Sequence, residues 1–160
     1  MCEYCGCRQI EPLAELMDEH LALLDDAGAI RRAVSNRQHG GAVDLLGQFA
    51  EALDRHVRRE EDGVFRALRD LGEFRDEVSE LEDEHLELHQ RIADLDPADP
   101  DAGDVLALLF ADLTDHIDKE DLGIFPVSVV SLGSAGWDTV ARVHGEQPSF
   151  LRERHHPDIT

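Results

Sequence analysis

Apolar residues recur at intervals of three and four positions through most of the first 125 residues. This spacing is the period of a helix with one buried face, whereas a half-buried strand would alternate every second residue. The pattern therefore predicts an all-α protein. Segments rich in Gly, Pro, Asn and Asp divide it into four expected helices, over about residues 12–35, from after Gly41 to about 71, 74–95 and 101–123.

The four predicted helices are long and their connections are short. Since a short connection leaves successive helices side by side and opposed in direction, we expect an antiparallel up-down-up-down four-helix bundle over residues 11–126. A Cys-rich segment, residues 1–10, precedes this bundle, and a C-terminal extension, residues 127–160, follows it.

The two terminal segments have distinct compositions. A short helix is expected over residues 134–144, and the polar, proline-containing tail from Gln147 onward is expected to be loosely held. The N-terminal segment admits three interpretations: free thiols, a small metal site completed by His155 or His156, or a thiol relay or sensor. Its cysteines are Cys2, Cys5 and Cys7.

The chain contains an internal repeat. Residues 56–65, HVRREEDGVF, return sixty positions later as residues 116–125, HIDKEDLGIF. Residues 15–24, ELMDEHLALL, resemble residues 80–89, ELEDEHLELH. The second predicted helix thus matches the fourth and the first matches the third, so equivalent residues should face each other across a pseudo-two-fold axis.

Ionisable residues interrupt the apolar core stripes of all four helices at one level. An unpaired buried carboxylate costs several kcal/mol, about half of a domain's typical stability, so these groups need a neutralising partner. Imidazoles and carboxylates are ligands for iron, manganese or zinc, and this number of them can hold two divalent ions with bridging carboxylates. The predicted ligands are His20, His56, Glu60, His85, His89, His116 and Glu120.

The two halves of the repeat differ at one candidate ligand. His89 follows His85 by four residues, whereas Leu24 stands at the equivalent position after His20. One ion should therefore lack a ligand, which predicts an open coordination position beside Leu24. Such a position on a redox-active metal is where a diatomic molecule or a peroxide would bind.

The motif order is a single His, then His-x-x-x-Glu, His-x-x-x-His and His-x-x-x-Glu, beginning at His20, His56, His85 and His116. This order, over about residues 11–126, resembles the hemerythrin-like (HHE cation-binding) family of non-haem di-iron proteins. The resemblance implies a four-helix bundle and two iron ions bridged by both carboxylates and by an oxo or hydroxo group.

The resemblance also raises an alternative for one bridging ligand. In the oxygen-carrying branch of the family the last His is usually followed five residues later by Asp, a position that Asp121 occupies here. The internal repeat favours Glu120, since Glu120 corresponds to Glu60. Asp121 is therefore only the second choice for the bridge.

The resemblance implies that the reduced iron pair reacts with hydrogen peroxide, nitric oxide or dioxygen. We expect His20 with His56 or His116 to hold the reactive ion, and His85 with His89 its saturated partner. Aliphatic side chains should exclude water, namely Leu21, Leu24, Leu53 and Leu113.

Three functions are compatible with such a site. The first is a peroxide- or nitric-oxide-detoxifying oxidoreductase with catalase- or peroxidase-like activity and an unknown electron donor. The second is a non-catalytic protein that binds, stores or senses oxygen or iron. The third is a structural zinc bundle.

The charge balance narrows the choice of partners. Asp and Glu number 36 against 15 Lys and Arg, a formal charge of −21, so nucleic acid and anionic membranes should be repelled. We find no apolar run of the roughly 20 residues that a membrane span needs and no secretory signal, so we expect a cytoplasmic protein.

Several other polar residues are interpreted as solvent-exposed. Charges that adjoin the motifs but fall off the core stripes are expected to be solvated: Glu61, Asp62, Glu84 and Glu87. The remaining histidines are expected at the surface: His39, His144, His155 and His156.

Overall fold

The structure, a computed structural model, describes residues 6–154 and contains only helices and connections in that range. Segment η1 is a 3-10 helix, and η2 and η3 are π-helical. In chain order the elements are η1 (Cys7–Gln9), α1 (Glu11–Ser35), α2 (His39–Glu60), η2 (Glu61–Phe65), α3 (Arg66–Leu71), α4 (Arg75–Ala93), α5 (Ala102–Lys119), η3 (Glu120–Ile124), α6 (Phe125–Ser131), α7 (Ser134–Glu146) and α8 (Leu151–Arg154).

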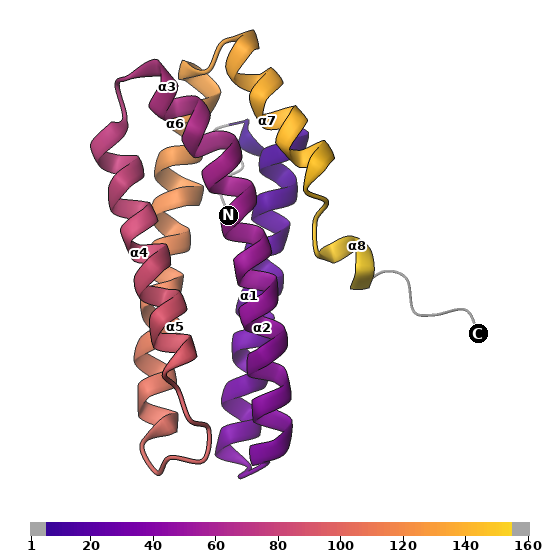
Figure 1. The fold of residues 1–160 in the computed structure, drawn as a ribbon, viewed down its shortest axis with the longest axis vertical. Coiled ribbons are helices and arrows are strands. Elements are labelled where there is room, and N and C mark those ends of the chain that lie inside the picture. The colour runs from indigo at the N-terminus through magenta and orange to yellow at the C-terminus, as the bar shows by residue number, and fades with distance from the viewer. Residues whose placement is uncertain (1–5, 155–160) are drawn as a thin grey trace, which may run out of the picture.

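The long helices pack side by side as a helical bundle (Figure 1). Helices α1 and α4 each contact both α2 and α5. The α1–α2 and α4–α5 connections lie at the lower end of Figure 1, and α3 and α6 lie at the upper end. Matching segments of the internal repeat therefore occupy equivalent places in the bundle.

The second and fourth helical stretches are each interrupted by a π-helical turn. Segments α2, η2 and α3 follow one another without a break, as do α5, η3 and α6. The expected end of the fourth helix near residue 123 is wrong, because helical structure continues to Ser131. Pro126 lies in the first turn of α6, where its missing N–H is tolerated.

The apolar core is divided into two clusters. The first, here called the lower apolar cluster, surrounds Phe49 on α2 and Leu109 on α5, and the second surrounds Phe65 in η2 and Phe125 in α6. On each long helical stretch one buried predicted ligand lies between the two clusters in sequence, namely His20, Glu60, His85 or Glu120, so a polar layer separates two aliphatic and aromatic layers.

The C-terminal extension is packed against the bundle through residue 154. Helix α7 covers the range of the expected short helix and contacts η2 and α3. The expectation of a loosely held tail is wrong for residues 147–154, because Ser149 and Phe150 are buried. Arg154 also pairs with Asp26 at 2.6 Å and lies 4.8 Å from the Phe150 ring centroid. Phe150 and Leu151 thus pack this segment against the lower apolar cluster, and polar contacts on either side add to the attachment.

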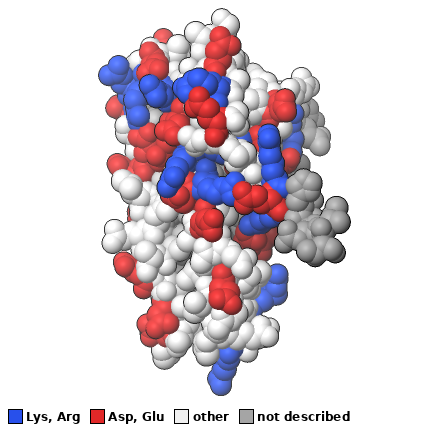
Figure 2. Space-filling model, turned by 45° about the vertical axis from the view of Figure 1, so that its right-hand side comes forward, with Lys and Arg blue, Asp and Glu red and all other residues white. Residues whose placement is uncertain are grey.

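Surface charges are locally paired. Figure 2 shows Lys and Arg side chains lying among acidic ones on one face, and several such pairs are within salt-bridge distance, including Arg55 with Glu153 at 2.9 Å. Among the described residues, none of the helices combines the length and the apolar character that a membrane crossing requires.

The anchoring role of Phe150 predicts a stability loss. Phe150→Ala should lower the free energy of unfolding by about 3 kcal/mol, because it empties a buried aromatic site. Urea unfolding followed by circular dichroism measures the change. Val130→Ala, at an exposed position, is the control and should change stability by less than about 0.5 kcal/mol. Equal stabilities of the two variants would contradict the anchoring role.

Candidate metal centre

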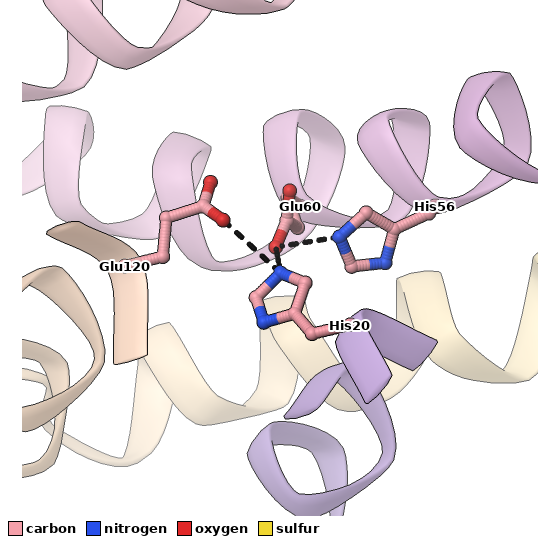
Figure 3. A group of neighbouring side chains, drawn as sticks. All are labelled: His20, His56, Glu60 and Glu120. Atoms are coloured by element: carbon pink, nitrogen blue, oxygen red, sulfur yellow. Dashed lines mark ion pairs between the residues drawn. The ribbon is translucent and has the colours of Figure 1, made fainter. Parts of the chain in front are cut away.

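Six of the seven predicted ligands converge in the polar layer. His20 projects from α1, His56 and Glu60 from α2, and Glu120 from the start of η3 (Figure 3). Their ligand atoms form one group, all within 4.8 Å of one another. A second group of the same kind consists of His85, His116 and Glu120. The structure thus pairs His20 with His56 and His85 with His116.

The two carboxylates lie between the two histidine pairs. Glu60 Oε1 is 3.3 Å from His20 Nε2 and 3.1 Å from His56 Nε2, while its Oε2 is 3.5 Å from His85 Nε2. Glu120 Oε2 is 3.1 Å from His20 Nε2, while its Oε1 is 3.1 Å from His116 Nε2 and 3.4 Å from His85 Nε2. Each carboxylate therefore turns one oxygen to each pair, which is the arrangement of a bridging ligand.

The inward-facing atoms fit a metal site. Both oxygens of Glu60 and Glu120 are buried and have no hydrogen-bond partner, and so are three of the nearby Nε2 atoms. A buried polar atom without a partner costs about 1–3 kcal/mol, so their concentration at one point requires compensation. Nitrogen and oxygen donors around a small space suit iron, manganese or zinc. The three Nε2 atoms are those of His20, His85 and His116.

A small cavity of about 10 Å³ lies beside these groups. Besides His20, His56, His85, His116 and Glu120, its walls are aliphatic: Leu23, Leu53, Leu113 and Ile117. The expectation that Leu21 shields the centre is wrong, because Leu21 is 45% exposed on the outer face of α1. Leu24 is partly buried against the lower apolar cluster.

An outer layer of carboxylates holds the other ring nitrogen of each converging histidine. His56 Nδ1 is 2.7 Å from Glu19, and His116 Nδ1 is 2.7 Å from Glu84. Since an ionised carboxylate only accepts, Nδ1 donates and Nε2 is left to face the centre. The expectation that Glu84 is merely solvated is wrong.

The other two histidines make the same kind of bond. His20 Nδ1 is 2.9 Å from Asp121, and His85 Nδ1 is 2.9 Å from Glu61. The expectation that Glu61 is a solvated charge is wrong as well. Asp121 lies on the outer side of His20, whereas Glu120 lies between the histidine pairs. The internal repeat carried this signal, since Glu61 and Asp121 occupy equivalent positions, but core-stripe reasoning missed it.

His89 lies outside both ligand groups. Its Nδ1 is 2.8 Å from the backbone oxygen of His85, and its Nε2 is buried without a hydrogen-bond partner. His89 also lines an apolar groove of about 590 Å³ between α2 and α4. Its role as a metal ligand stays a prediction.

Each of the two central carboxylates stands at a π-helical turn. Segment η2 starts directly after Glu60, and η3 starts at Glu120. Single π turns within α-helices are frequent at functional sites because they re-aim side chains. The hydrophobic period predicted a continuous α-helix, so it missed both turns.

Burial and nearby acids have opposite effects on the imidazoles. Burial alone lowers the pKa of His85, but contacts with Glu120 and Glu61 outweigh it and raise the pKa to about 10. Burial likewise lowers the pKa of His20, and contacts with Asp121 and Glu120 raise it well above its ordinary value. These imidazoles are therefore protonated at neutral pH when no ion is bound.

The two carboxylates are shifted in the complementary direction. Burial and the neighbouring Glu120 raise the pKa of Glu60, but His56 and His20 overcome both and lower the pKa to about 2. Burial also raises the pKa of Glu120, and His116 and His20 bring it well below its ordinary value. Protons on the imidazoles thus neutralise the acids until a cation takes their place.

The remaining interpretations have mixed outcomes. His39 is exposed as expected, whereas the surface placement of His144 is wrong because this residue of α7 is buried. Asp62 and Glu87 are exposed, as expected.

The N-terminal interpretations fall mostly outside the described residues. Cys7 is fully buried and disulfide-bonded, so the free-thiol interpretation is wrong for this residue. Cys2, Cys5, His155 and His156 lie outside the described residues.

Comparison with known families agrees with this geometry. Residues 11–128 match the model of the hemerythrin HHE cation-binding domain, which is well over half of the chain. The protein therefore belongs to the hemerythrin HHE cation-binding family, which confirms the resemblance inferred from the motifs. Comparisons with curated proteins and with solved structures gave no match. The matched range ends before α7.

The shifted pKa values predict opposite pH responses for stability and metal binding. A raised pKa of about 10 for His85 stabilises the metal-free fold fully below its unfolded pKa of about 6.5, and this contribution disappears as pH rises through about 10. The lowered pKa of Glu60 contributes above its unfolded pKa of about 4.3 and is lost as pH falls through about 2.

Metal affinity should instead rise with pH, since a cation must displace the imidazole protons. Adding zinc to the metal-free protein in weak buffer at pH 7 should release protons, measured with a pH electrode or by calorimetry in buffers of different ionisation enthalpy. Zinc binding without proton release would show that the imidazoles of His20 and His85 are neutral beforehand.

Proposed function

We propose that this protein is a hemerythrin-like di-iron protein whose metal centre reacts with hydrogen peroxide, nitric oxide or dioxygen. The observation that carries the proposal is the placement of Glu60 and Glu120, each of which turns one oxygen to His20 and the other to His85. The proposal includes the antiparallel order of the helices and two iron ions with a bridging oxo or hydroxo group. Iron supplies one-electron chemistry and affinity for small oxygen and nitrogen ligands.

Different histidines of the chain would bind each of the two iron ions. His20 and His56 would bind one ion, and His85 and His116 the other, with His89 as a further candidate ligand on that side. The outer carboxylates orient the imidazoles and keep Nε2 turned inward.

The aliphatic wall limits the access of water to the centre. Leu23, Leu53, Leu113 and Ile117 border the cavity beside the ligands. A dry surrounding strengthens the interaction between the carboxylates and bound cations, since water no longer screens it. It also favours small uncharged ligands over hydrated anions.

A non-catalytic role in binding, storing or sensing oxygen or iron is the second candidate. The observation that favours it is the lining of the cavity, where the described residues supply only ligand groups and aliphatic carbons. Cleavage of a peroxide bond commonly uses a positioned acid or base besides the metal. A catalyst would decompose added peroxide over many cycles without losing iron, whereas a carrier would bind oxygen reversibly and be bleached by peroxide.

Metal quantitation with an optical spectrum tests the proposal. Freshly purified protein should contain two iron ions per chain and show near-ultraviolet charge-transfer absorption. Glu60→Ala should lose at least one ion and this absorption, because it removes a bridging group from between the two histidine pairs. Glu87→Ala, at an exposed position on α4 between His85 and His89, is the control and should keep both ions. Two zinc ions and no iron would instead support a structural zinc bundle.

A further inference from the structure

Two equivalent chains of polar contacts lead outward from the two halves of the centre. On one side His56 Nδ1 contacts Glu19, and Arg59 Nη1 donates to the other oxygen of Glu19. On the other side His116 Nδ1 contacts Glu84, and Lys119 Nζ donates to the other oxygen of that carboxylate. Arg59 and Lys119 occupy equivalent places in the repeat, each directly before a bridging glutamate. Each chain is thus an imidazole, a carboxylate and a cation.

The two chains differ in their access to water. Arg59 is 1% exposed and Glu19 is 0% exposed, whereas the side chains of Lys119 and Glu84 are 47% and 27% exposed. A surface cleft of about 330 Å³ between α4 and α5 reaches Glu84, Lys119 and His116. The same imidazole–carboxylate–cation chain is therefore buried in one half of the bundle and accessible to solvent in the other.

The C-terminal extension covers Arg59 and Glu19. His144 on α7 places Nδ1 2.9 Å from Arg59 Nη2, and Ser149, beyond the end of α7, is 1% exposed. Glu15 completes the enclosure, with Oε2 2.5 Å from Arg59 Nη2. In Figure 1, α7 lies on the right of the bundle, and α4 and α5 lie on the left. The extension thus covers only the half that contains His56.

The contacts suit an arginine held in a fixed position. Burial and the charge of Arg59 lower the pKa of His144 to about 4, so at neutral pH its ring is uncharged and Nδ1 can accept from the guanidinium. A helix docked for stability alone needs no buried arginine, because apolar replacements of buried ion pairs are often equally stable or more so. Val140 and Val143 already supply an apolar contact for α7.

We propose that residues 134–150, outside the matched family range, form part of the metal centre by fixing the Arg59–Glu19–His56 chain and so making the two ion sites inequivalent. Arg59 and His144 act as positioning residues for the ion held by His20 and His56. The inference rests on the proposed two-ion centre. Outer groups that orient a metal-binding histidine typically change metal affinity by about 10- to 100-fold, whereas an exposed ion pair changes it by about fivefold or less.

Zinc titration of matched variants tests this assignment, with zinc alone as the probe. Competition with a chromophoric chelator gives the two affinities, and imidazole nitrogen spectra identify the histidines that respond in each step. Arg59→Met should weaken zinc at His20 and His56 by about 10-fold or more and leave the other step unchanged. Lys119→Met is the matched control in the exposed chain of contacts. It should weaken zinc binding at His85 and His116 by about fivefold or less. Arg59→Lys should restore most of the loss.

Hydrogen exchange of the ring N–H groups is the second measurement. The Nδ1 proton of His56 should exchange with solvent more slowly than that of His116, and His144→Ala should remove most of this difference. This variant keeps Arg59 and tests the inference should Arg59→Met fail to fold. A merely structural extension would instead lower stability while leaving the zinc affinities and the exchange difference intact.

The outcomes separate this inference from the proposed function. Failure of the wild-type protein to bind two cations would overturn both. Two bound zinc ions, with affinities that Arg59→Met and Lys119→Met reduce by equal factors, would overturn the role of the extension alone. So would equal exchange rates of the two Nδ1 protons in the wild-type protein.

Discussion

Two buried carboxylates at the middle of a helical bundle impose most of the organisation seen in this protein. Glu60 and Glu120 are inaccessible to water, and an ionised acid in such a place is tolerated only beside positive charge. The imidazoles around them supply that charge as protons, as the raised pKa values of His20 and His85 indicate. A bound cation would displace these protons, so metal affinity should depend on pH for the same reason that the fold does.

The same constraint explains the layers around the centre. A polar layer interrupts aliphatic packing, so the core forms two clusters, around Phe49 and around Phe65. The π-helical turns fall where the acids must be aimed inward. The aromatic rings of Phe65 and Phe125 stack on His85 and His20 at 5.8 Å, which fixes the imidazole planes from the apolar side. The outer carboxylates fix the same rings from the polar side.

The converging histidines and acids could be predicted from the sequence because they break a periodic pattern. His56 and Glu60 stand where leucines would continue the stripe, and the repeat duplicates the anomaly at His116 and Glu120. The outer acids Glu61 and Glu84 could not be recognised by that criterion, because they lie off the stripe and resemble ordinary surface charges. They can be recognised instead by asking which residue accepts a hydrogen bond from Nδ1, since every buried imidazole whose Nε2 faces inward needs such an acceptor.

The packing of the C-terminal extension against the bundle could not be predicted from the local sequence pattern either. His144 and Phe150 lie in a polar stretch without a regular apolar period, and their burial results from docking onto helices far away in sequence. The π turns also left no sign in the apolar period. Helical structure continues beyond the expected end near residue 123, because Pro126 lies in the first turn of α6 and does not interrupt it.

The departures from internal symmetry place the two halves in different environments. Ala50 lines the apolar groove beside His89, whereas its repeat equivalent, Phe110, is buried against Phe49 with ring centroids 5.6 Å apart. The cleft beside His116 and the groove beside His89 both flank α4, and the extension covers the opposite side of the bundle. The half that contains His20 and His56, for which fewer histidine ligands are predicted, is therefore the dry half. A vacant coordination position there would face few competing waters, and charge interactions with a small bound ligand would be weakly screened. An open coordination position and a closed surface are thus compatible, provided that the ligand is small and uncharged.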